Sequence, residues 1–379
     1  MAAAAGLTGW IRSRWRRFDA PPRLAGIDLA RGLAVIGMIA AHLLVIDAFD
    51  PGDPATWIDV ANGRSSILFA TLAGVSIALV TGGQRPFRGA RRARASARIA
   101  LRALLLWAIG LMLVATGVPV YVILPAYAIL FLLSLPFLGM RPPALFLLAA
   151  VVGVVMPFPQ ALWDAAPFWS TPDGLTVAAL IGWQYPFPVW IAFLLAGMAI
   201  GRTDLRSPRT AALLLAAGAA LAALGYALAA VSGAGVVAES QSILGAVWTA
   251  RAHSSGVLEV VGSGGFAIAV IGLCLLVCAT ALRWVAVPLR AVGSMPLTAY
   301  VVQLVAWAVV AASVLGATGD LSGFRALDPF WPMTLALILA CTAWTLLIGR
   351  GPLEAVIARL STWAVREPAR AGGVGRLEG

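Results

Sequence analysis

Residues 23–45, RLAGIDLARGLAVIGMIAAHLLV, decide how this chain is interpreted. The stretch is long and apolar enough to cross a membrane as one helix, yet it contains Asp28, Arg31 and His42. Arg31 and His42 are eleven positions apart, which on an α-helix is about three turns and a rise of about 16 Å. Asp28 lies one turn before Arg31, so the spacing predicts all three side chains on one face. Because ionisable groups in membrane helices are costly, this face predicts one wall of a polar path.

The rest of the composition agrees with a membrane protein. The chain has 379 residues, of which 61% are hydrophobic, and its mean hydropathy is +0.93. A soluble domain is only about half apolar. We therefore expect an all-α, polytopic helical bundle with about ten transmembrane helices and both termini on one side. The expected spans are residues 29–48, 62–82, 99–117, 120–139, 143–163, 185–201, 209–231, 259–281, 292–316 and 330–349.

Charge predicts the orientation of this bundle. All 27 basic residues are arginine, and cytoplasmic termini would put 24 of them inside and only Arg64, Arg251 and Arg325 outside. The positive-inside rule therefore predicts cytoplasmic termini and a plasma-membrane location, the inner membrane in a bacterium. The pI near 11 follows from the same arginines, which set the topology and attract anionic lipid heads or an anionic cytoplasmic ligand. The sequence therefore does not require a nucleic-acid partner.

Three regions are expected along the chain. Residues 1–22 form a basic cytoplasmic segment, 23–350 the transmembrane domain, and 351–379 a cytoplasmic amphipathic helix with a flexible tail. The first apolar run lacks a small-residue cleavage site, so it is expected to remain as a helix rather than to be removed as a signal peptide. Two long outer loops are expected at 164–184 and 232–258, the first with a short re-entrant or interfacial stretch at 175–181.

The chain has two histidines, and this topology puts both near the outer surface. His42 ends the first span and His253 precedes the eighth. Histidine is the usual general base near neutral pH, and an ionisable group within a membrane helix favours a functional role for His42. The alternatives are a satisfied core residue for His42 and an ordinary loop residue for His253. Glu259, six residues after His253, is the most interesting partner carboxylate. The alternatives on that side are Asp47, Asp50, Asp53 and Asp59.

Arginines mark the inner side. Asp28 and Arg31 form either a salt bridge that settles the helix end in the interface or an anion site for a phosphorylated ligand. The arginine-rich segment 85–102, which includes Arg91 and Arg92, is either a retention loop or a phosphate-binding cluster. In the second span, Arg64 and Ser76 either pack against other helices or contact the ligand. No metal site is predicted, since the cysteines lie in apolar runs without histidine or carboxylate neighbours.

The motifs resemble known membrane acyltransferases. Arg31-x10-His42 resembles the first-helix motif of the acyltransferase-3 kind, whereas GIDLARG at 26–32 and WIDVANGRSSILFATLAGVSIAL at 57–79 are more similar to heparan-alpha-glucosaminide N-acetyltransferase and the YeiB-type proteins. The blocks at 253–276, 292–304 and 349–360 are similar to the YeiB-type C-terminal region. The resemblance covers residues from about 23 to about 360.

This resemblance implies transfer of an acetyl-like group from cytoplasmic acyl-CoA, expected to be acetyl-CoA, to a hydroxyl or amine of an extracytoplasmic glycan or glycolipid. His42 would be general base or acyl carrier, with Arg31 as its motif partner. We add His253 and Glu259 to the catalytic group. The expected donor-binding residues are Asp28, Arg31, Arg64, Ser76, Arg91 and Arg92. Two alternatives stay open: a transporter or lipid-handling protein using the same path, and a binding protein without turnover. A homodimer is also compatible with the sequence.

Overall fold

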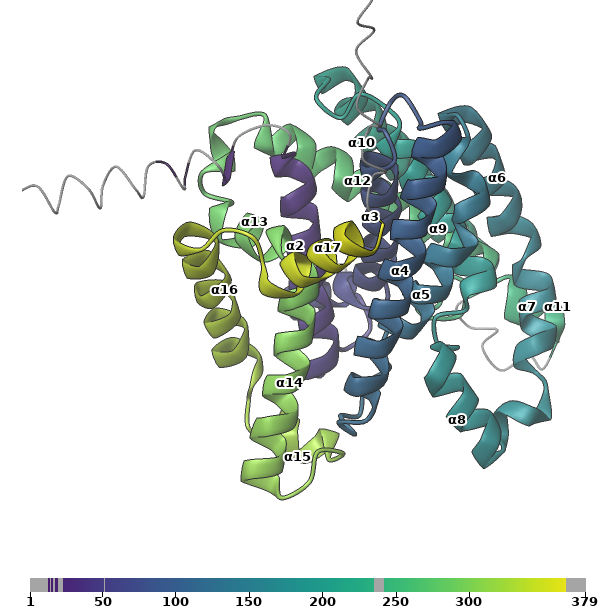
Figure 1. The fold of residues 1–379 in the computed structure, drawn as a ribbon. Coiled ribbons are helices and arrows are strands. Elements are labelled where there is room, and N and C mark those ends of the chain that lie inside the picture. The colour runs from purple at the N-terminus through teal and green to yellow at the C-terminus, as the bar shows by residue number, and fades with distance from the viewer. Residues whose placement is uncertain are drawn as a thin grey trace, which may run out of the picture.

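The computed structural model describes residues 13, 15, 18–19, 23–50, 52–234 and 242–365. Within these residues all regular structure is helical, which confirms the all-α fold (Figure 1). Most of the segment 1–22 and the tail from residue 366 lie outside the described residues. The helices are α2 (Ala25–Leu43), α3 (Arg64–Val80), α4 (Gly89–Val114), α5 (Leu124–Leu133), α6 (Pro142–Val155), α7 (Pro157–Asp164), α8 (Pro172–Ile181), α9 (Phe187–Gly201), α10 (Pro208–Val231), α11 (Ile243–Val247), α12 (Val257–Cys278), α13 (Val287–Ser294), α14 (Pro296–Leu315), α15 (Leu321–Arg325), α16 (Phe330–Leu347) and α17 (Pro352–Ala364), with short 3-10 turns η1 (Pro54–Ala61), η2 (Leu135–Gly139), η3 (Pro167–Ser170) and η5 (Ala281–Arg283).

The chain is a multi-pass membrane protein, but the expected ten spans are not confirmed. Seven of the described helices are long and apolar enough to cross a membrane, and the pair α6–α7, bent by 41°, makes an eighth. Helices α5 and α9 have only 10 and 15 residues. At about 1.5 Å per residue, α9 extends about 22 Å, less than a hydrocarbon core of about 30 Å. Almost all of α9 is buried, so its neighbours, rather than lipid, surround it.

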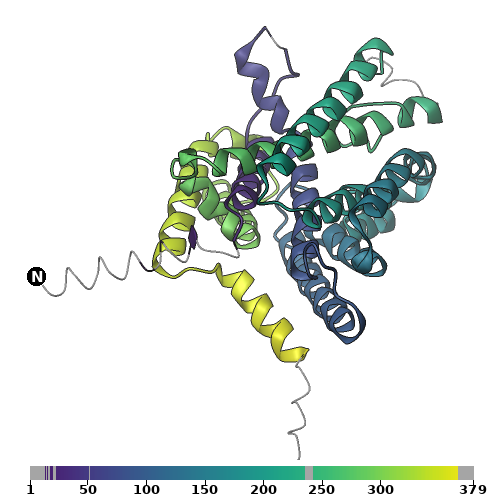
Figure 2. The same cartoon turned by 90° about the horizontal axis from the view of Figure 1, so that it is seen from above.

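Helices α2 and α3 lie at the centre of the bundle, with α13, α14 and α16 on one side and α4, α5, α6 and α9 on the other (Figures 1 and 2). Small residues permit the close crossings. A Cβ on Gly293 of α13 would lie 1.7 Å from the carbonyl oxygen of Asp28, and one on Gly197 of α9 would lie 1.8 Å from that of Thr71. Close backbone approach of this kind is typical of membrane helix pairs. It fixes how α2 and α3 present their polar residues.

The first helix begins earlier than the sequence predicts. It runs from Ala25 to Leu43 rather than from 29 to 48. The charges of Asp28 and Arg31 do not delay its start because they pair with each other and lie inside the fold. The helix ends at Leu43, where the next residue adopts extended backbone angles. His42 is therefore in the last turn of α2, at the end of the span as expected.

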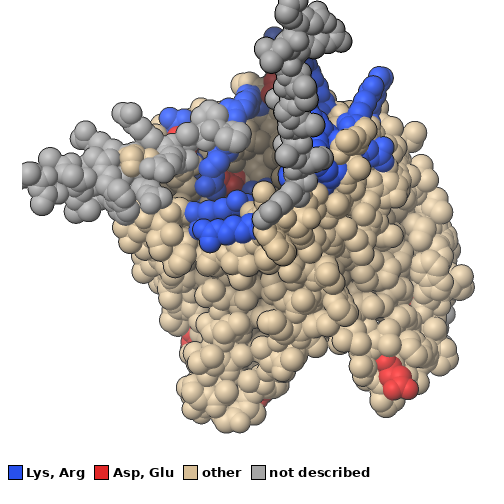
Figure 3. Space-filling model, viewed as in Figure 1, with Lys and Arg blue, Asp and Glu red and all other residues tan. Residues whose placement is uncertain are grey.

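Charge is concentrated at the two ends of the molecule. Arginine side chains surround a hollow at the end where α17 lies, and the flanks of the visible face are almost free of charged groups (Figure 3). Helix α4 has the same asymmetry, since its first half is rich in arginine and its second half is apolar. Uncharged flanks between charged ends are what a lipid bilayer requires. We call the arginine-rich end the basic end.

The expected outer loops contain short helices. Residues 175–181, expected as a re-entrant or interfacial stretch, lie in α8, whose first turn Thr171 caps by accepting the amide of Gly174. Trp169 and Trp183 stack at 4.5 Å and close the loop around α8. Helix α11 lies in the second loop, of which residues 235–241 lie outside the described residues. These loops are at the end opposite the arginines (Figure 1).

Candidate functional site

A cavity of about 320 Å³ opens at the end opposite the arginines, and both histidines line it. We call it the histidine cavity. His42 comes from the last turn of α2, and His253 comes from the loop before α12. The cavity walls also carry other polar groups and small residues. They are Ser65 and Ser66 from α3, Asn62 and Gly63 before it, Tyr121, Gln184, Tyr185 and Arg325.

The His42 side chain is held by packing and by its main chain rather than by a carboxylate. Its Nδ1 is buried and has no hydrogen-bond partner among the described residues. Its ring lies 6.5 Å from that of Trp307, which is fully buried in α14. Its carbonyl oxygen accepts hydrogen bonds from Nε and Nη2 of Arg325. These contacts hold the imidazole and the end of α2 in place beside the cavity that His42 lines.

The loop that carries His253 is strained and is tied to Glu259. His253 and Ser255 have φ angles of 63° and 55°, a region that L residues seldom adopt. The Glu259 carboxylate accepts the amides of His253 at 2.7 Å and Ser255 at 2.6 Å, and the hydroxyl of Ser254 at 3.1 Å. The expected carboxylate thus orients the backbone of His253, not its ring. The cavity walls partly desolvate His253, and this burial lowers its pKa.

A glycine brings the two histidines to one cavity. Gly63 precedes α3 with a φ of 68°, and a Cβ there would lie 2.9 Å from the Cβ of Ala252. The close contact seats the His253 loop on the start of α3. Because α2 packs beside α3, His42 then faces the same space.

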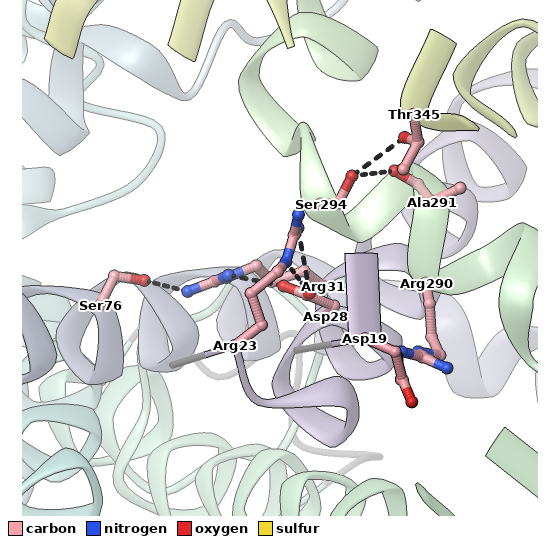
Figure 4. Close-up of polar contacts among 9 residues, drawn as sticks. All are labelled: Asp19, Arg23, Asp28, Arg31, Ser76, Arg290, Ala291, Ser294 and Thr345. Carbon is pink, nitrogen blue, oxygen red and sulfur yellow. Dashed lines mark hydrogen bonds and ion pairs between the residues drawn. The ribbon is translucent and has the colours of Figure 1, made fainter. Parts of the chain in front are cut away.

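At the basic end, Asp28 links two arginines (Figure 4). Its carboxylate lies 3.2 Å from Nη2 of Arg23 and 3.2 Å from Nη1 of Arg31. Nη2 of Arg31 donates to the hydroxyl of Ser76 at 2.7 Å. The side chain of Arg31 is 20% exposed, and it lines a cavity of about 680 Å³ that we call the ion-pair cleft. Nearby Arg290 is buried against Asp19 and serves the fold.

A second hollow of about 460 Å³ lies between α4 and α17, and we call it the arginine cleft. Five arginines and one carboxylate line it. They are Arg91, Arg94, Arg98, Arg102, Arg350 and Glu354. The carboxylate of Glu354 accepts the backbone amides of Leu297 and Thr298 and so caps the start of α14. The cleft therefore has an excess of positive charge, which favours an anionic ligand.

Arg102 connects this cleft with the interior. It lies deeper in α4 than the other arginines, and its Nε is buried without a hydrogen-bond partner among the described residues. It lines both the arginine cleft and a small central cavity of about 60 Å³. Arg31, Ser76 and Tyr127 line the central cavity as well. A partly buried cation inside an apolar helix is costly, and Glu354, the carboxylate of the same cleft, already accepts hydrogen bonds at the start of α14. This position therefore favours a ligand that supplies negative charge.

The cavities follow one another along α3. Leu79 lines the ion-pair cleft, Ser76 the central cavity and Ser66 the histidine cavity. A layer formed by Tyr127 and Phe69 lies between the central cavity and the histidine cavity. Tyr127 stacks on Phe69 at 5.6 Å, and its hydroxyl donates to the carbonyl of Ser66 at 3.3 Å. The polar path is therefore closed at Tyr127 in this structure.

Comparison with protein families identifies this arrangement. A family model described as heparan-alpha-glucosaminide N-acetyltransferase, catalytic, matches residues 23–230, more than half of the chain. The chain belongs to this family. A second model, described as a protein of unknown function (DUF418), matches residues 202–364, as the resemblance to YeiB-type proteins implies. A search of the curated proteins found no match. The family indicates a transmembrane acetyltransferase.

The acetyltransferase fold does not gather all the residues chosen from the sequence. Arg64 lies at the start of α3, where its Nε donates to Tyr226 at 2.7 Å. Arg92 is half-buried and donates to the carbonyl of Pro136. Neither lines the clefts at the basic end, so we no longer assign them to donor binding. The carboxylates of Asp50 and Asp53 bind backbone amides of their own loop, and the side chains of Asp47 and Asp59 do not line the histidine cavity.

Sequence reasoning missed two arginines that the acetyltransferase fold brings to its cavities. Arg102 was counted with its charged neighbours, although it follows the apolar residues Ile99 to Leu101, and a charge that deep in a span is a usable signal. Arg325 was noticed only as an outer arginine. Nothing near it in the sequence points to His42, which is 283 residues away.

Proposed function

We propose that this protein transfers an acetyl group from cytoplasmic acetyl-CoA to an amine or hydroxyl of an extracytoplasmic glycan or glycolipid, in the inner membrane of a bacterium. The observation that carries the proposal is the order of cavities along α2 and α3. Arginines line the clefts at one end, and two histidines line the cavity at the other. An anionic donor and a neutral base for the acceptor need these two environments.

The donor would bind at the basic end. Coenzyme A carries phosphates at one end and a thiol at the end of its pantetheine arm. The phosphates fit the excess charge of the arginine cleft, where Arg91 and Arg102 provide guanidinium donors. Arg31 and Ser76 line the central cavity on the way inward. The arm would then extend past Tyr127 toward His42, which a rise of about 16 Å along α2 separates from Arg31.

His42 would act as the general base. Removing the acceptor proton as the acceptor attacks the thioester is worth about 10²–10⁴ in rate for a well-placed base. His42 lines the histidine cavity, and no carboxylate or other described residue occupies its Nδ1. His253, on another wall of the same cavity, would contact the acceptor.

The test compares the wild type with His42→Gln, which keeps a polar side chain without the base. Purified protein in liposomes receives acetyl-CoA and a synthetic α-glucosaminide, and mass spectrometry measures the acetylated product. We expect a rate lower by about 10²–10⁴, with Asp173→Asn on exposed α8 as the control. A folded His42→Gln protein that works at the wild-type rate would refute the role of His42.

The closed layer at Tyr127 supports one alternative, a transporter that opens alternately to its two ends. The same liposomes separate the two functions. Labelled acetyl-CoA trapped on one side, exchanging across the membrane without any acetylated product, would favour transport. Product without exchange of intact acetyl-CoA would favour transfer.

A further inference from the structure

Arg325 is bound to the main chain of the proposed base. Its Nε and Nη2 donate to the carbonyl oxygen of His42 at 3.0 and 2.8 Å. That carbonyl is in the last turn of α2, where no later helical amide reaches it. A cation at this position also complements the partial negative charge of a helix C-terminus. The guanidinium thus fixes the end of α2 and the backbone of His42.

The element that carries Arg325 is itself held firmly. The Asp320 carboxylate caps α15 by accepting the amide of Gly323 at 2.8 Å and the hydroxyl of Ser322 at 2.9 Å, and these bonds lower its pKa. Phe324 is fully buried and stacks on Trp307 at 4.8 Å. Trp307 in turn contacts the ring of His42. One unit, α14 and α15, therefore supports both the ring and the backbone of His42.

The charge of Arg325 is not matched by a carboxylate. No residue that the structure describes forms a salt bridge with it, and none of the residues that line the histidine cavity is acidic. Two of its nitrogens are occupied by His42. Within the described residues Nη1 makes no hydrogen bond, and the side chain lines the cavity. A donor thus remains for a negatively charged atom beside His42.

We propose that Arg325 is a catalytic residue whose Nη1 stabilises the oxyanion of acetyl transfer, a role that rests on the proposed function. The acceptor lone pair attacks the thioester carbonyl carbon, and the carbonyl π electrons move to the oxygen, to which Nη1 donates. His42 takes the proton of the acceptor. The oxyanion then reforms the carbonyl, the C–S bond breaks, and the departing thiolate of coenzyme A takes the proton from His42. Because two nitrogens hold the His42 backbone, base and oxyanion donor keep one fixed geometry.

The experiment compares Arg325→Ala and Arg325→Lys with Arg251→Ala, an exposed outer arginine that lines none of the cavities. The liposome assay uses acetyl-CoA and the synthetic α-glucosaminide. For Arg325→Ala we expect kcat to fall about 10²–10³-fold with an unchanged Kd for acetyl-CoA, and added methylguanidinium to restore part of the rate. Lysine should give an intermediate kcat, because one ammonium group does not reproduce the guanidinium fork. Arg251→Ala should match the wild type.

Two results would overturn the role: an Arg325→Ala kcat within about threefold of the wild type, or no gain from methylguanidinium in a folded variant that has lost activity. If the alanine variant does not fold, a wild-type kcat for the lysine variant would overturn it. A wild type without product would instead count against the proposed function. In that case the hold of Arg325 on the His42 backbone is tested without turnover, by the rate at which diethylpyrocarbonate modifies His42. Arg325→Lys should change this rate and Arg251→Ala should not. Equal rates in the three proteins would show that Arg325 does not position His42.

Discussion

Glu259 should hold His253 in the histidine cavity, and Glu259→Gln tests this with a change of two atoms' chemistry. One carboxylate oxygen accepts the amide of His253, and the other accepts the amide of Ser255 and the hydroxyl of Ser254. Glutamine keeps one acceptor oxygen and turns the other into an amide NH2 group, which is a donor and cannot accept the hydrogen bonds of Ser254 and Ser255. Losing two hydrogen bonds to a charged group costs about 3–5 kcal/mol. The positive φ angles of His253 and Ser255 favour release of the loop once those bonds are lost.

Amide hydrogen exchange measures this loss directly. About 3–5 kcal/mol corresponds to exchange at His253 and Ser255 that is faster by roughly 10²–10⁴. The matched control is Ser255→Gly, which keeps the amide that Glu259 binds and accepts a φ of 55° without strain. It should leave exchange unchanged or slow it. Equal exchange in the wild type and Glu259→Gln, or faster exchange in the glycine variant, would refute the reasoning.

Three further predictions follow from the cavities. Arg102→Ala should weaken acetyl-CoA binding about 10- to 100-fold, because a hydrogen bond to a charged group is worth about 1.5–3 kcal/mol. Binding of S-acetyl-N-acetylcysteamine, which has no phosphates, should not change. Equal losses of affinity for the two ligands in calorimetry would contradict the prediction. Tyr127→Ala should open the central layer, so that a Ser66→Cys thiol reacts with an impermeant maleimide supplied from the basic end; unchanged labelling would contradict it. Burial lowers the pKa of His253, so its titration midpoint measured by NMR should lie below the ordinary value of about 6.5, and the contribution of His253 to folding stability should fall as pH drops below about 6.5, since the unfolded chain then binds the proton more readily. A midpoint above about 6.5, or a loss of stability at low pH that His253→Asn leaves unchanged, would contradict this.

Local patterns in the sequence were sufficient for one half of the site. Asp28, Arg31 and His42 belong to one helix, so helical geometry alone relates them, and the structure pairs the first two and opens Arg31 and His42 onto cavities at opposite ends of α2. The all-α fold followed from apolar runs for the same reason. The number of spans did not, because α9 is buried among other helices and is shorter than a lipid-facing helix.

Contacts between distant segments were not predictable in this way. His253 joins His42 because Gly63 adopts a positive φ and accepts Ala252 at close range, and no periodicity records that contact. Arg325 reaches His42 through a short helix that depends on Phe324 packing against Trp307. Arg64 shows the opposite error. Because few arginines are expected on the outer side, Arg64 was predicted to contact a ligand. In the structure its guanidinium donates to the Tyr226 hydroxyl and to the Asp59 carbonyl oxygen instead.

The separation of charge along the path limits what must cross the membrane during acetyl transfer. Arg31 and Arg102 stand on the basic side of the Tyr127 layer, and the central cavity between them is otherwise mostly apolar. Moving a phosphate through that layer would carry a full charge into a low-dielectric region, which is costly. Under the proposed function, holding the phosphates among the arginines would avoid this cost, because only the uncharged thioester end of the donor would then have to pass Tyr127. On the far side the proposed oxyanion is short-lived, and His42 with Arg325 would receive the proton and the charge that develop there. A donor with its charge close to the thioester should therefore bind to the clefts yet fail to react.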